Sequence, residues 1–156
     1  MKKYLFGLLS LSASAFAAQS PVDFHDHLGM QMWSLRETAK ESTTGALDLV
    51  KQYGLKEVET AGLGTLSADQ YKAALDERGL VAIGIHAGYE ALQTDLPNVI
   101  KTARTLGAHY IVCPWIPHGK DGFTEELAHQ VARDFNVWGK ACHDAGLQLG
   151  WHPHGF

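Results

Sequence analysis

The sequence predicts an α/β fold of the (β/α)8-barrel type that is incomplete, with about five strands and four helices. Three observations lead to this prediction. An amphipathic segment that ends in glycine is repeatedly followed by an apolar, β-branched run. Each such run has one bulky face and one small or polar face. The 156 residues fall well short of the about 250 that a complete barrel usually takes.

Each expected helix-to-strand passage is marked by a glycine, at Gly54, Gly79, Gly107 and Gly146. A glycine just past a helix end adopts the left-handed conformation that closes the last turn. The expected strands are residues 28–34, 57–59, 81–85, 110–112 and 148–151. Alternation of strand and helix predicts parallel strands with right-handed crossovers. Both an open doubly wound sheet and a part of a barrel fit this order.

Two of the expected helices have recognisable first turns. Ser67 and Gln70 form a capping-box pattern. Thr124 is a suitable N-cap for the last helix. The apolar positions of that helix lie three or four residues apart and define one face: Leu127, Val131, Phe135, Trp138 and Cys142.

The two faces of the expected strands favour the barrel over the open sheet. In the third strand the bulky set is Val81, Ile83 and Ile85, and the small set is Ala82, Gly84 and His86. In the last strand the corresponding sets are Leu147, Leu149 and Trp151, then Gln148, Gly150, His152 and His154. A doubly wound sheet buries both faces under helices. A barrel turns one face inward and places its chemistry at the C-terminal mouth.

The two cysteines are expected to be buried free thiols. By strand parity Cys113 shares a face with Trp115, toward the mouth, whereas Cys142 lies on a helix outside the wall. An exported chain would permit a disulfide, which keeps that alternative open.

The N-terminus has the pattern of a secretory signal peptide. Lys2 and Lys3 precede an uncharged apolar run over residues 4–16, and Ala15 and Ala17 suit a signal peptidase. The competing interpretation is a membrane anchor, but the run is shorter than the about 20 residues that span a bilayer. We expect residues 1–18 to be the signal peptide, 19–27 a linker and 28–156 the barrel portion, exported to a bacterial periplasm.

Composition argues against several partners. The formal net charge is −4 and no Lys/Arg cluster occurs, which disfavours nucleic acid. A second long apolar segment is absent, so no membrane span is expected after signal cleavage. The first and fifth strands of a partial barrel would be unpaired edges, which are prone to association. A homodimer is therefore left open.

Polar and aromatic side chains occur near the ends of the expected strands. They are Gln31, Trp33, Glu59, His86, Trp115, His118, His152 and His154. In a barrel these positions converge at one mouth. Aromatic rings stack on sugar C–H faces while amide, imidazole and carboxylate groups bind hydroxyls or a divalent metal. A small-molecule sugar or polyol is the expected partner.

Five segments carry a resemblance to a known family: residues 29–36, 56–62, 81–86, 110–117 and 150–156. Together, in order and with matching spacings, they resemble the sugar phosphate isomerase/epimerase family of xylose isomerase-like TIM barrels. The resemblance covers the N-terminal portion of such a barrel.

The resemblance implies a divalent metal, Mn, Mg, Zn or Co, and proton transfer in the pocket. By this likeness Glu59 and His86 would be catalytic, and Gln31, Trp33, Trp115, His118 and His152 would bind substrate. His154 would be a metal ligand. Members usually read His-x-His-x-x-Glu here with the Glu on the metal, so the main ligands are expected beyond Phe156. A truncated and inactive portion is thus one expectation for this chain.

The implied function is a metal-dependent sugar isomerase or epimerase that moves a proton next to a carbonyl. A first alternative is a lyase or dehydratase acting on a keto-inositol or 3-keto-glycoside. A second is a non-catalytic sugar-binding protein or an inactive remnant. A phosphodiesterase of the apurinic endonuclease type is disfavoured by the acidic charge.

Overall fold

The computed structural model describes residues 27–154. The expected signal peptide, the expected linker up to residue 26, and residues 155–156 lie outside this range. Within it, no helix combines the length and the apolar character needed to cross a membrane.

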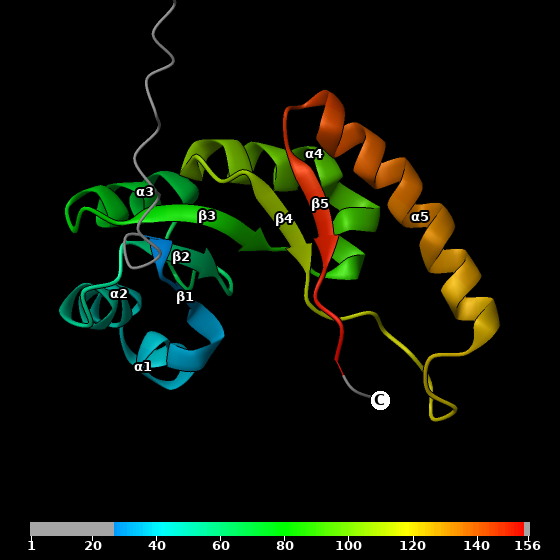
Figure 1. Ribbon diagram of the computed structural model, residues 1–156, viewed down its shortest axis with the longest axis horizontal. Coiled ribbons are helices and arrows are strands. Elements are labelled where there is room, and N and C mark those ends of the chain that lie inside the picture. Colours follow the sequence, from blue (N-terminus) through cyan, green and yellow to red (C-terminus); the bar gives the residue numbers. More distant parts are fainter. Residues whose placement is uncertain (1–26, 155–156) are drawn as a thin grey trace, which may run out of the picture.

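Five parallel strands form one sheet in the order β1-β2-β3-β4-β5. Their bounds are β1 Gly29–Gln31, β2 Glu57–Thr60, β3 Val81–His86, β4 Tyr110–Cys113 and β5 Gln148–Trp151. Figure 1 shows the sheet curving from β1 to β5, with α4 and α5 on its outer side. Sequential order without reversal is the arrangement of a barrel wall and excludes the doubly wound alternative, so the α/β barrel prediction is confirmed.

The connections contain five α-helices and one 3-10 helix in the described range, where four helices were predicted. They are η2 Met32–Leu35, α1 Arg36–Glu41, α2 Thr43–Gln52, α3 Ala68–Asp76, α4 Tyr89–Leu106 and α5 Glu125–Asp144. The extra helix arises because Ser42 is extended, with φ −156° and ψ 110°, and interrupts the first helical segment. Its side chain accepts a hydrogen bond from the Gly45 N–H at 3.0 Å and starts α2.

The first strand is shorter than predicted, because only Gly29–Gln31 of residues 28–34 are extended. The chain then turns into η2 at Met32. The Gln31 side chain causes the turn locally, since its Oε1 accepts a hydrogen bond from the Trp33 N–H at 2.9 Å.

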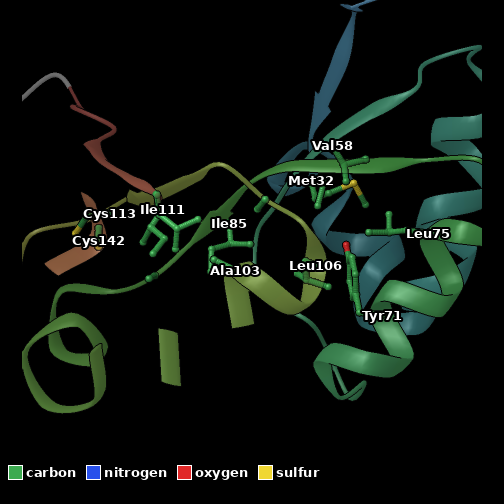
Figure 2. Close-up of a cluster of buried hydrophobic side chains, with 14 of the residues drawn as sticks. Met32, Val58, Tyr71, Leu75, Ile85, Ala103, Leu106, Ile111, Cys113 and Cys142 are labelled. Atoms are coloured by element: carbon green, nitrogen blue, oxygen red, sulfur yellow. The ribbon is translucent and has the colours of Figure 1, made fainter. Parts of the chain in front are cut away.

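The hydrophobic core fills the space between the sheet and the helices. Val58, Ile85 and Ile111 supply the sheet side, and Leu75 and Leu106 come from α3 and α4 (Figure 2). Each of these side chains is buried. The opposite face of the sheet, which we call the inner face, carries Glu59, His86 and Val112. Among residues 27–154 no helix covers this face (Figure 1).

Strand parity fails in the first half of β3. Val81 was expected on the helix side, but it is 55% exposed, and Ala82 is buried instead. The register explains the difference, because Val58 pairs with Ala82 while Glu59 pairs with Gly84. Ile83 is the extra residue of a β-bulge, which reverses the alternation there. Past the bulge, Gly84 and His86 face inward and Ile85 faces the helices, as predicted.

Cys113 lies on the helix side with Ile111 and not toward the mouth. The parity argument that grouped it with Trp115 was wrong, because the chain leaves the strand at Pro114 and Trp115 is 48% exposed. Both Cys113 and Cys142 are buried free thiols in one core. Burial raises the pKa of each thiol.

The predicted helix termini are confirmed. Ser67 and Gln70 make both hydrogen bonds of the capping box, at 3.2 and 2.9 Å. The Thr124 hydroxyl accepts from the Leu127 N–H at 3.3 Å. The four junction glycines all have positive φ, between 68° and 79°. These signals act over four residues or fewer, which is why the sequence alone predicts them.

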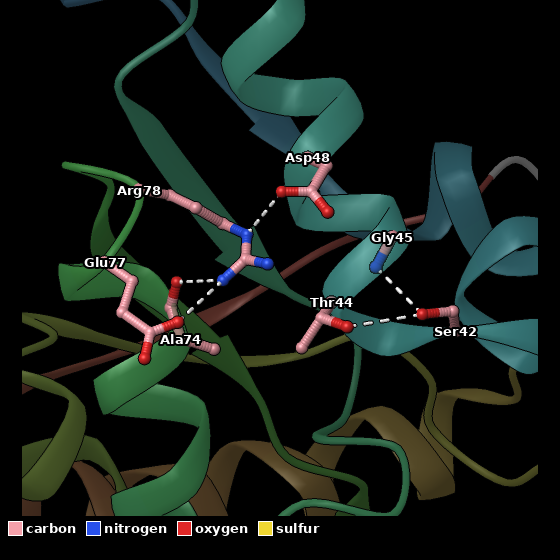
Figure 3. Close-up of polar contacts among 7 residues, drawn as sticks. All are labelled: Ser42, Thr44, Gly45, Asp48, Ala74, Glu77 and Arg78. Atoms are coloured by element: carbon pink, nitrogen blue, oxygen red, sulfur yellow. Dashed lines mark hydrogen bonds and ion pairs between the residues drawn. The ribbon is translucent and has the colours of Figure 1, made fainter.

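An arginine ties α3 to α2. Nε of Arg78 lies 2.8 Å from Oδ1 of Asp48, and its Nη1 donates to the Ala74 carbonyl at 2.9 Å (Figure 3). Glu77 lies farther from the same guanidinium, at 3.5 Å. The Arg78 side chain is 14% exposed but Asp48 is 61% exposed, so the ion pair is screened by solvent and the burial of Arg78 adds to the contact. It fixes α2 against the next βα unit.

Gly64 is a position where a methyl group is not tolerated. Its φ is +61°, and an added Cβ would lie 2.2 Å from Oγ1 of Thr43. We expect Gly64→Ala to lower the free energy of unfolding by about 1–3 kcal/mol, from left-handed strain and overlap. Urea denaturation measures this.

Gly79→Ala is the matched control, because Gly79 has φ +68° but nothing within 4 Å of its added Cβ. The Gly79→Ala variant therefore measures the cost of the left-handed backbone conformation without any steric overlap. Combining Gly64→Ala with Thr43→Ala should recover the overlap part. Equal losses in the two glycine variants would contradict the steric explanation.

Candidate functional site

The C-terminal ends of the strands surround a hollow of about 500 Å³. Six of the eight predicted site residues line it: Gln31, Trp33, His86, Trp115, His152 and His154. A volume of this size is within the range of small-molecule sites, about 300–1,000 Å³. The other two, Glu59 and His118, each contact a lining residue.

Glu59 and His86 form a close pair on adjacent strands. Oε1 of Glu59 lies 2.7 Å from Nε2 of His86, and the two side chains are 26% and 10% exposed. Gly84 is paired with Glu59 in the sheet. A Cβ there would lie 3.5 Å from Cγ of Glu59, so a small residue keeps room for the carboxylate. The pair is therefore a shielded carboxylate and imidazole within reach of the hollow.

Gln31 presents its side-chain amide group to His86, next to the Glu59 carboxylate. Because Oε1 of Gln31 accepts from the Trp33 N–H, its amide nitrogen is the group that faces His86. That nitrogen lies 3.4 Å from Nε2 of His86. One imidazole nitrogen thus faces an amide donor and a carboxylate oxygen together.

Trp33 stands between two hollows. It is 59% exposed, and the guanidinium carbon of Arg36 lies 5.3 Å from its ring centre. Arg36 also donates to the Trp33 carbonyl at 3.0 Å. Trp33, Ala61 and Gly62 line both the main hollow and a second one of about 190 Å³. Arg36 therefore holds the indole as a wall of the site.

Trp115 is the second aromatic wall. Its ring centre lies 4.8 Å from that of His118 and 5.6 Å from that of His154. Nδ1 of His118 lies 2.9 Å from the Ile116 carbonyl. From the core side, the Cys113 thiol donates to the Trp115 carbonyl at 3.4 Å. His118 thus packs on Trp115 and does not itself line the hollow.

His152 follows β5 and extends its ladder, because its N–H donates to the Cys113 carbonyl at 3.0 Å. Its ring is stacked on His154 with centres 4.9 Å apart, and it stands edge-on to His86 at 5.9 Å. Donor atoms of Glu59, His86 and His152 all lie within 4.8 Å of one another. This is the single such group of three found in residues 27–154, and His154 is not part of it.

The start of α4, beside the hollow, is anchored to α5. The Tyr89 hydroxyl donates to Asp134, and its ring contacts Trp138 edge-on at 4.9 Å. Burial, and then the Asp134 carboxylate, raises the pKa of Tyr89 to about 12. The phenol therefore stays a neutral donor and holds Gly88 at the rim of the hollow.

Sequence reasoning missed the small residues of the lining, Ala61, Gly62, Gly88 and Pro114. Gly62 has φ +93°, and its place directly after β2 could have indicated a turn at the mouth. Arg36 was also missed as a positioning residue. Its contact with Trp33 depends on η2, which the sequence pattern did not reveal.

Comparisons with known proteins identify the fold. Neither the protein-family models nor the curated proteins contain a match to the chain. A sugar phosphate isomerase/epimerase from Parabacteroides distasonis is similar, with TM-score 0.63 and 21% identity over 89% of this chain and 55% of that chain. A xylose isomerase domain-containing protein from Salmonella typhimurium has TM-score 0.64 and 16% identity over 85% and 51%.

A protein from Sinorhizobium meliloti gives TM-score 0.62 and 15% identity over 81% of this chain and 50% of that chain. At these identities the similarity establishes the fold. The chain thus has the fold of part of a xylose isomerase-like barrel, and the resemblance predicted from the sequence is confirmed at that level. The chain spans about half the length of the solved structures that it matches.

Proposed function

We propose that the protein is an isomerase or epimerase that moves a proton next to the carbonyl of a sugar or keto-sugar. The observation that carries the proposal is the Glu59 and His86 pair at the side of a hollow walled by Trp33 and Trp115. Half-length similarity to a sugar phosphate isomerase/epimerase supports the same class.

The walls suit a sugar ring. Two indoles offer flat apolar faces to C–H groups, and Gln31 and His152 offer polar groups to hydroxyls. If residues 1–18 direct export to the periplasm, as the sequence predicts, a free sugar is the favoured substrate over a phosphorylated one.

The pair itself can move a proton. A carboxylate 2.7 Å from an imidazole nitrogen can accept a proton from carbon and share it with the ring. Partial burial reduces screening, so the charge of the Glu59 carboxylate acts strongly on the substrate. Returning the proton to the same carbon from the other face epimerises it, and returning it to the neighbouring carbon isomerises the sugar.

A divalent metal belongs to this proposal, as the family resemblance implies. Imidazole is a kind of ligand that Zn, Mn or Co takes in proteins, and His154, the ligand that the resemblance implies, lines the hollow. When bound, such an ion polarises substrate oxygens. The tryptophans would still orient the ring.

The test is solvent exchange. The chain is incubated in D2O with a panel of aldoses and ketoses, with and without added Mn²⁺ or Zn²⁺, and followed by NMR. We expect deuterium at the carbon next to the carbonyl and slow appearance of an epimer or isomer.

Other outcomes identify the alternatives. An unsaturated product with loss of a leaving group would assign a lyase or dehydratase. Saturable sugar binding without any exchange would assign a sugar-binding role. Trp115→Ala reports whether an observed reaction uses this hollow, because it removes a wall without touching the Glu59 and His86 pair.

A further inference from the structure

We infer that Glu59, His86 and His152 form a divalent cation site of their own. This set differs from the ligands that the family resemblance implies, which are His154 and residues on later strands. It deepens the proposed function, because it would place the cation at the side of the same hollow. Its test measures binding and not catalysis.

The donor atoms are already nearly close enough. Two ligands about 2.1 Å from one tetrahedral ion lie about 3.4 Å apart. The three donors lie within 4.8 Å of one another, and Glu59 and His86 are at 2.7 Å. The contact between Glu59 and His86 must therefore open, and the longer separations must close by up to about 1.4 Å, which side-chain rotation supplies.

The two neighbours of Nε2 of His86 make opposite demands on that nitrogen. The Gln31 amide group donates, so it favours a lone pair on Nε2 of His86. Glu59 as a carboxylate favours a proton on that same nitrogen. One nitrogen cannot satisfy both neighbours at once. A cation between Nε2 and the carboxylate takes these two groups as ligands and gives up only the long 3.4 Å contact with the Gln31 amide.

The backbone holds the three ligands in place. Glu59 and His86 lie on paired inner strands, β2 and β3. His152 is fixed by its N–H bond to Cys113 and by its stack on His154. Three protein ligands leave a fourth position, as in catalytic zinc sites. His86 and His152 line the hollow, so that position opens toward the substrate.

The test titrates Zn²⁺ and Co²⁺ into untagged chain stripped with EDTA, by calorimetry and visible absorption. We expect one strongly bound ion per chain and a Co²⁺ spectrum without a thiolate band, because Cys113 and Cys142 are buried in the core on the helix side. Glu59→Gln, His86→Gln and His152→Gln should each weaken binding at least about tenfold.

Glu57→Gln is the matched control. Glu57 lies on the same strand and face, and it too has a histidine neighbour, His27 at 3.0 Å, but within residues 27–154 no second imidazole completes a group of three. Its affinity should stay within about twofold of the parent chain. His154→Gln tests the rival ligand, and because His154 only stacks on His152, it should weaken binding less than His152→Gln does. Circular dichroism and thermal midpoints establish that the variants are folded.

Absence of binding, or equal loss in Glu57→Gln, would overturn the inference. If only His154→Gln loses cation binding, the ion is bound by His154, the ligand that the resemblance implies, and the inference is again overturned. The two proposals fail separately. Cation binding without solvent exchange would support the cation site and contradict the proposed enzyme activity. Solvent exchange by EDTA-stripped chain that binds no ion would support the activity and contradict the cation site.

Discussion

Glu59→Gln is expected to slow solvent exchange into an active sugar by about 10²- to 10⁴-fold, the usual contribution of a general acid or base. The amide keeps the size of the carboxylate but cannot accept a proton, and it weakens the contact with His86. The measurement is the initial rate of deuterium incorporation at saturating sugar and, separately, at low sugar. We expect the loss mainly in kcat, because the variant keeps Trp33 and Trp115, the walls that would bind the ring in the proposed function.

Glu57→Gln again provides the comparison, since it removes a carboxylate two residues earlier on the same strand. Its rate should stay within about twofold of the parent rate. If both substitutions slow exchange equally, the general negative charge of the inner face matters and the pair does not. If neither slows it, the proton is moved by another group and Glu59 loses its proposed role.

Ile111→Ala is expected to lower the free energy of unfolding by about 2–5 kcal/mol, which is the range for a fully buried isoleucine. Ile111 is 0% exposed and packs in the layer between β4 and the helices (Figure 2). A cavity left there would be closed in by neighbours from several elements. Urea denaturation followed by circular dichroism measures the change.

Val112→Ala is the neighbouring control on the opposite face of the same strand. Val112 is only partly buried and faces inward, so its loss should cost roughly 1 kcal/mol or less. The ratio of the two effects tests which face of the sheet holds the core. A larger effect at Val112 would mean that the inner face is covered in solution.

Features that depend on a few neighbouring residues could be predicted from the sequence. The Ser67 and Gln70 capping box and the glycine at Gly107 need only a turn of helix to act. The apolar face of α5 needs only the helical repeat, and its Val131, Trp138 and Cys142 are buried. These local signals gave the order of the elements and therefore the barrel architecture.

Features that depend on pairing between strands could not be predicted. The bulge at Ile83 exists only in relation to β2, so a strict two-residue alternation placed Val81 on the wrong face. Likewise, the chain leaves β4 at Pro114, and alternation carried past that point misplaced Cys113 relative to Trp115. In both cases the alternating hydrophobic pattern was present, but the face that each residue takes depends on strand pairing or on where the strand ends.

The candidate site lies between these extremes. The ends of parallel strands meet at one edge, which was enough to collect Gln31, His86 and His152 around one hollow. Their distances were not predictable, since the closeness of Glu59 to His86 depends on the register of β2 against β3. The approach of His152, and not His154, to Glu59 and His86 likewise depends on the path of the backbone after β5.

The bulge at Ile83 has an evolutionary consequence. In an unbroken strand, Val81 and His86 would lie on opposite faces, because five positions separate them. The extra residue absorbs the odd count, so both face inward. Deleting the codon for Ile83 would shorten β3 and still leave the imidazole at the mouth. Insertions and deletions at this one place can therefore change the length of the strand between relatives without turning a functional side chain away.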